Sequence, residues 1–92
     1  MAKSIIQDEK YCYFCGSQSW LELHHIMNGA DKTKSEKYGL MVYLCHYCHN
    51  EPPHGVHHNR RNMDKLRRIG QKAFMKKYPK KDFIFEFGRN YL

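Results

Sequence analysis

Two Cys-x-x-Cys pairs, Cys12/Cys15 and Cys45/Cys48, contain every cysteine of this 92-residue sequence. Thiolates at this spacing supply two metal ligands from one turn, and a structural zinc ion takes four ligands in a tetrahedron. A small domain often needs a metal or disulfides to supplement a thin core. We therefore predict one structural Zn²⁺ held by all four cysteines, which would tie the front of the chain to its middle. A redox dithiol or plain buried thiols are the alternatives.

The N-terminal stretch MAKSIIQDEK lacks the apolar segment of a signal peptide, and no run approaches the roughly 18 apolar residues of a membrane span. We therefore expect a cytoplasmic protein that does not enter a membrane. In that compartment, paired cysteines more often bind metal than form disulfides.

Positive charge is concentrated in the last third of the sequence. Lys and Arg number 16 against 9 Asp and Glu, and ten of the 16 lie between Arg60 and Lys81, where Asp64 is the only acid. Such a segment predicts a polyanionic partner, above all nucleic acid, although a solvated helix face would have the same composition. The candidate nucleic-acid-binding residues are Arg60, Arg61, Arg67, Arg68 and Lys72.

The hydrophobic pattern predicts a small α+β fold. WLELHHI (20–26) and LMVYLC (40–45) are strand candidates separated by a polar loop, and together they predict a β-hairpin. Apolar residues at helical spacing predict an amphipathic helix from about Asn59 to Tyr78, which Pro79 ends. Phe83, Phe85 and Phe87 alternate with Ile84 and Glu86, a pattern that predicts a short strand with a phenylalanine face.

All seven histidines fall into two clusters, His24/His25 and the set His46, His49, His54, His57 and His58. Because the cysteines fill a zinc site by themselves, the histidines are free for other chemistry. Neighbouring residues of a strand point to opposite faces, so His24 and His25 can do different jobs. If zinc holds the two Cys-x-x-Cys pairs (the two knuckles) together, it also brings the end of the first strand near His49.

The order C-x-x-C, ELHHI, a loop and LC-x-x-CHN resembles an HNH endonuclease of the ββα-metal (His-Me finger) type. The resemblance covers about Cys12 to Asn59 and is closest to small phage proteins that carry an extra four-cysteine zinc. It implies a single HNH nuclease domain over 1–92, with a polar lead-in at 1–10, a ββα-metal core with zinc knuckles at 11–58, and a basic helix and C-terminal strand at 59–92. It also implies DNA as substrate and a catalytic divalent ion, which could be Mg²⁺, Mn²⁺, Ni²⁺ or Zn²⁺. A homodimer or a phage DNA-processing partner is left open.

Carried over residue by residue, the resemblance makes His24 a ligand of the catalytic metal and His25 the general base that activates water. His49 matches a second ligand. Pro53 occupies the position of the third, so His54 is the predicted third ligand, with His57 or His58 as alternatives.

The sequence departs from the family where the middle Asn is expected, because Leu40 stands there. That Asn orients the base, so Asn28 or another residue does its work here, or the function is missing. Two other functions remain open: a non-catalytic zinc module that binds nucleic acid through its basic helix, and a metal buffer or sensor.

Overall fold

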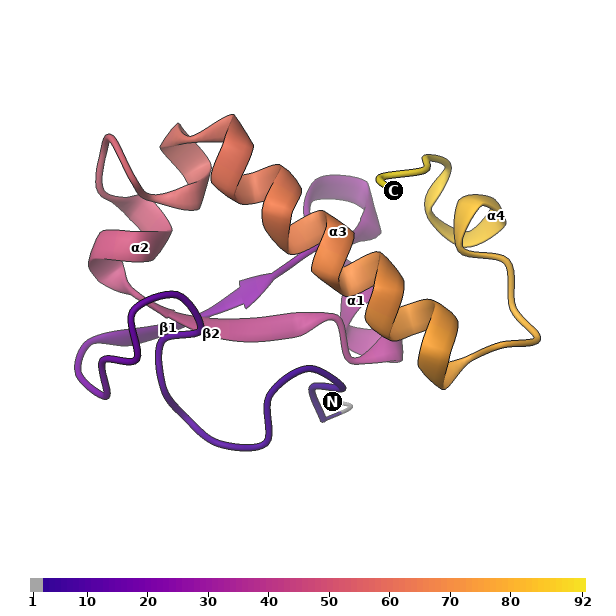
Figure 1. The fold of residues 1–92 in the computed structure, drawn as a ribbon, viewed down its shortest axis with the longest axis horizontal. Helices are drawn as coiled ribbons and strands as arrows, with labels where there is room; N and C mark the ends of the chain where they lie inside the picture. Colours follow the sequence, from indigo (N-terminus) through magenta and orange to yellow (C-terminus); the bar gives the residue numbers. More distant parts are fainter. Residues whose placement is uncertain (1–2) are drawn as a thin grey trace.

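A computed structural model describes residues 3–92, so the first two residues of the predicted polar lead-in lie outside it. Over these residues, the chain is a small α+β domain with a two-stranded antiparallel sheet, one α-helix between its two strands and three after them (Figure 1). Its elements in chain order are β1 (Leu21–His25), the 3₁₀ turn η1 (Gly29–Asp31), α1 (Lys32–Tyr38), β2 (Met41–Cys45), α2 (His46–Asn50), the 3₁₀ turn η2 (Val56–His58), α3 (Arg60–Lys77) and α4 (Phe83–Phe87).

The predicted hairpin is present, and its register fixes which residues share a face. Leu21 pairs with Cys45 at one end, and His25 pairs with Met41 at the other. The hairpin therefore joins the second cysteine knuckle to the start of β1. The connection is more than the predicted polar loop, because α1 forms within it and ends at Gly39, which has a φ of +73°. Glycine adopts this left-handed backbone without steric cost, so it suits the end of a helix.

The amphipathic helix predicted from about 59 to 78 is α3. It runs over one face of the hairpin (Figure 1). Asn59 caps the helix by accepting a hydrogen bond from the Asn62 backbone N–H. Leu66 and Phe74 are fully buried in the core. At Gly70 an added Cβ would lie 3.1 Å from Ile26, so glycine allows the helix to approach the end of β1 closely.

The segment predicted to be a phenylalanine-faced strand is instead the helix α4. Asp82 caps its start by accepting from the Ile84 N–H, and Gly88 ends it in the left-handed conformation. Phe83 and Phe87, four residues apart, pack on the core, whereas Phe85 is 82% exposed. The local alternation was consistent with a strand, but two caps and an i, i+4 apolar pair favour a single helical turn.

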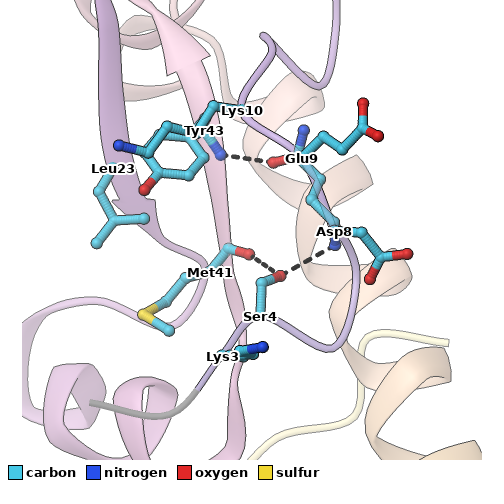
Figure 2. A pocket seen from close by; sticks show the side chains of 9 residues that line it. Lys3, Ser4, Asp8, Glu9, Lys10, Leu23, Met41 and Tyr43 are labelled. Carbon is cyan, nitrogen blue, oxygen red and sulfur yellow. Dashed lines mark hydrogen bonds between the residues drawn. The ribbon is translucent and has the colours of Figure 1, made fainter.

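The N-terminal segment runs along the edge of β2 that β1 leaves free and hydrogen-bonds to its backbone. The Tyr13 N–H donates to the Tyr43 carbonyl, and the Ser4 hydroxyl donates to the Met41 carbonyl. A pocket of about 600 Å³ lies between this segment and the side chains of Leu23, Met41 and Tyr43. Figure 2 shows the residues that line it. Within the described residues, no helix has both the length and the apolar character needed to cross a membrane.

Candidate metal centres

The four cysteines converge, and their sulfur atoms all lie within 4.8 Å of one another. Cys12 and Cys15 come from the first knuckle, where Gly16 turns the chain with a φ of +80°. Cys45 ends β2 and Cys48 lies on α2. All four are free thiols, and the Sγ atoms of Cys15 and Cys45 are 3.6 Å apart. This grouping is consistent with the predicted structural zinc.

The environment of the thiols fits a soft divalent cation. Burial raises the pKa of Cys12, but hydrogen bonds from the backbone near Cys45, Cys15 and Phe14 outweigh burial and lower this pKa to about 7. At Cys48, burial and the neighbouring thiols raise the pKa. Four thiols crowded together in this way cannot all ionise unless a cation compensates their charge, and Zn²⁺ binds thiolates.

A second cluster contains His24, His49 and His57, each of which offers a ring nitrogen within 4.8 Å of the others. They come from β1, α2 and η2 respectively. The His49 Nε2 lies 3.3 Å from His24 Nδ1 and 3.0 Å from His57 Nε2. Three imidazole nitrogens that face one another form a donor set suited to Zn²⁺, Ni²⁺ or Cu²⁺. The cluster could therefore hold a second metal.

His24 is held in the neutral form that a metal ligand needs. Its residue is only 2% exposed, and burial, followed by the neighbouring charges of His49 and His57, lowers the pKa of His24 to about 3. Burial likewise lowers the pKa of His57. At physiological pH, the lone pair of His24 is therefore available to a metal rather than occupied by a proton.

Glu22 supports the histidine cluster from behind, a role that the sequence patterns did not reveal. Its Oε1 accepts from His49 Nδ1 at 2.7 Å and from the Asn50 amide at 2.9 Å, while its Oε2 accepts from His46 Nδ1 at 2.9 Å. The hydrogen bonds from His49 and His46 lower the pKa of Glu22. A carboxylate on one ring nitrogen fixes the tautomer and turns the other nitrogen toward the metal. The available signal was the position of Glu22, two residues before His24 on the same strand face.

The structure groups His57, rather than the predicted His54, with His24 and His49. The chain leaves α2 through Pro52 and Pro53, which interrupt the helix, and η2 then returns the backbone toward His49. The ring of His54 instead lies 5.7 Å from that of Tyr47. His58, the other alternative, is exposed and lies outside the three-histidine group.

His25 does not join the three histidines, although it is the next residue after His24. Its Nε2 lies 2.9 Å from the Glu36 Oε1 on α1, and its side chain is 14% exposed. Asn28, the residue expected to orient the base in place of the missing Asn, instead accepts a hydrogen bond from Arg67 at 3.2 Å, and Leu40, which stands at the missing Asn's position, is completely buried in the core. Strand alternation thus separates the two adjacent histidines, as expected.

Among the predicted nucleic-acid-binding residues, Arg67 differs from the rest. Arg60, Arg61, Arg68 and Lys72 are exposed on α3, and Arg60 pairs with Asp64 at 3.0 Å. Arg67 is half-buried, and its positive charge contributes to the lowered pKa values of His24 and His57. Its buried Nε lacks a hydrogen-bond partner within residues 3–92. A cation with one buried, unpaired N–H donor therefore lies near His24 and His57.

The pocket in Figure 2 is separate from both clusters, because its lining consists of N-terminal residues and the side chains of Leu23, Met41 and Tyr43. Comparisons of the chain with protein-family models, with curated proteins and with solved structures found no match.

Proposed function

We propose that this chain is a single-domain, metal-dependent HNH endonuclease that hydrolyses DNA phosphodiester bonds. The observation that carries the proposal is the convergence of His24, His49 and His57 beside a separate four-cysteine cluster. A site with three protein ligands leaves coordination positions open, whereas four thiolates close a site. The chain therefore has one donor set suited to structure and one suited to chemistry.

His25 is the proposed general base. A neutral imidazole within reach of a water molecule can take its proton, which is the usual role of histidine as a general base. As the proton moves to His25, the water oxygen forms a bond to phosphorus and the bond from phosphorus to the 3′ oxygen breaks. A divalent ion on the three histidines supplies positive charge for the transition state and the departing oxygen.

The basic face of α3 is the proposed DNA contact. Arg60, Arg61, Arg68 and Lys72 are exposed there, and their contacts to phosphates position DNA without reading its sequence. Arg67, whose charge acts on His24 and His57, is the proposed phosphate contact nearest the reacting group. Because such binding releases counterions, affinity should fall steeply as salt rises.

The test is a plasmid nicking assay with added Mg²⁺, Mn²⁺ or Ni²⁺ that compares the wild type with His25→Ala. Loss of the general base should lower the cleavage rate by about 10²–10⁴-fold, the usual worth of this group. Lys80→Ala, which removes an exposed charge beyond α3, is the matched control and should cut like the wild type.

Two results would contradict the proposal. If wild type and His25→Ala cut equally, the base is wrongly assigned or a contaminant does the cutting. If neither cuts with any metal while both bind DNA in a salt-dependent manner, the chain is the non-catalytic zinc-containing nucleic-acid-binding module.

A further inference from the structure

His25 makes one close contact to a charged side chain, and this contact comes from an element that the sequence did not predict. Glu36 lies on α1, and its Oε1 is 2.9 Å from the His25 Nε2. A carboxylate can only accept a hydrogen bond, so the proton of the neutral imidazole resides on Nε2. The lone pair is then on Nδ1, which is the atom left free to receive a proton.

The helix that carries Glu36 is anchored to the end of β1 by its neighbour Ser35. The completely buried Ser35 hydroxyl donates to the Met27 carbonyl at 2.6 Å and accepts from the Met27 N–H at 2.9 Å. The backbone carbonyl of Ser35 also accepts from the Leu40 N–H. Buried hydrogen bonds therefore fix the start of α1 to Met27, two residues after His25, so Glu36 and His25 do not meet at the tip of a loose loop.

The contact is a poor candidate for a purely stabilising ion pair. The Glu36 side chain is 40% exposed, and exposed pairs contribute only about 0–1 kcal/mol to folding. A carboxylate that sets the tautomer and orientation of a catalytic imidazole has a much larger effect on rate, as the Ser-His-Asp triad illustrates. The two roles therefore predict different experimental results.

We propose that Glu36 is a positioning residue, which holds His25 with its proton on Nε2 and thereby presents Nδ1 as the basic atom. The inference rests on the proposed function, in which His25 is the general base. It assigns to α1 the orienting work that neither the buried Leu40 nor the Arg67-bound Asn28 performs.

The kinetic test compares Glu36→Ala and Glu36→Gln with the wild type in the nicking assay. Both should lower kcat by about 10–100-fold with KM little changed, since an outer carboxylate on a working imidazole is typically worth this much. Glu36→Asp should recover part of the rate. Glu51→Gln is the matched control because Glu51 contacts His46 at the same 2.9 Å distance, and it should cut at the wild-type rate.

A spectroscopic test reads the contact without catalysis. In the zinc-loaded protein with ¹⁵N-labelled histidine, at alkaline pH, long-range ¹H–¹⁵N correlations should show His25 as the Nε2–H tautomer. Glu36→Ala should show a mixture of both tautomers, while its zinc content and thermal unfolding remain those of the wild type.

The outcomes separate the two proposals. A wild type that cuts through His25, together with a Glu36→Ala variant of unchanged kcat or unchanged tautomer, overturns the inference alone. A wild type that does not cut with any metal overturns the proposed function and this inference with it. A His25 proton on Nδ1 in the wild type overturns the assigned role of Glu36 whatever the rates are.

Discussion

The cysteine cluster and the histidine cluster are both groups of metal-binding side chains, but they are built differently. The cysteines supply four sulfurs from two knuckles, and three of the four residues are buried. The histidines supply three nitrogens from β1, α2 and η2, and His57 is exposed to solvent. A closed tetrahedral set holds structure together, whereas an incomplete, partly open set leaves room for a substrate.

The two clusters also depend on each other unequally. Cys48 and His49 are consecutive residues on α2, so the cysteine cluster fixes the helix that presents His49. His24 and Glu22 lie on β1, whose first residue pairs with Cys45. Loss of the cysteine site should therefore remove the histidine site as well, whereas loss of a histidine should leave the cysteine site intact.

The largest effect is expected from Cys45→Ser or from chelation of zinc. Structural zinc contributes about 10–16 kcal/mol of apparent binding energy in small peptides that fold only with metal. We expect this chain to lose its cooperative thermal unfolding transition, measured by circular dichroism, together with its one tightly held zinc. His57→Ala is the control and should change stability by no more than about 0.5 kcal/mol, as exposed positions usually do. A zinc-free protein that folds fully would show that the cysteine cluster is not a structural zinc site.

The next largest effect separates His49 from His54. Loss of a contact that supports a metal ligand typically weakens metal binding by about 10–100-fold. Because His49 is itself a proposed ligand, His49→Ala should weaken the binding of Ni²⁺ or Mn²⁺ to the zinc-loaded protein by more than this. His54→Ala should leave that affinity unchanged, since its ring lies beside Tyr47 instead of in the cluster. Calorimetric titration measures both. Equal losses in the two variants would return His54 to the ligand set.

Glu22→Gln should have an intermediate effect. In the wild type, one carboxylate oxygen of Glu22 accepts from His49 and the other from His46. The Gln amide fits the same space, but it is uncharged and has only one oxygen to accept a hydrogen bond. We expect second-metal affinity to fall by about 10–100-fold with the zinc content unchanged. A simultaneous loss of zinc, measured by elemental analysis, would show that the two sites are less separable than the contact pattern indicates.

The smallest effect compares Arg67→Ala with Arg68→Ala. Each should weaken DNA binding modestly and lower the slope of log affinity against log salt by about 1, as loss of one phosphate contact does. Only Arg67→Ala should also lower kcat, because only Arg67 lies beside the histidines. Fluorescence anisotropy at several salt concentrations and the nicking assay give the two readouts. Equal kcat values would place both arginines in general DNA contact alone.

Local chemistry made several features predictable. Cysteine spacing indicated the four-thiol cluster, apolar runs indicated the hairpin, and helical periodicity indicated α3. The opposite orientations of His24 and His25 followed from strand alternation. Within each cysteine pair, within each strand and along α3, the relevant residues lie within a few positions of one another, so local backbone geometry determines their relation.

The features that were missed depend on packing between distant segments. The alternation over 83–87 favours a strand, but in the folded chain the caps at Asp82 and Gly88 and the contacts of Phe83 and Phe87 with buried Phe74 outweigh it. Helix α1 was missed because its polar sequence KTKSEKY has little amphipathic pattern, and buried Ser35 and Tyr38 stabilise it through tertiary contacts.

By itself, the sequence determined which atoms are available for metal binding and how each short element is built, because both follow from residue type and local spacing. Only the tertiary structure decided that His57 joins His24 and His49, that Glu22 braces His49, and that Glu36 meets His25. His49 and His57 are 8 residues apart in the sequence, and His24 and His57 are 33 residues apart. Contacts over such separations depend on how turns and helices pack, which side-chain spacing along the chain does not specify.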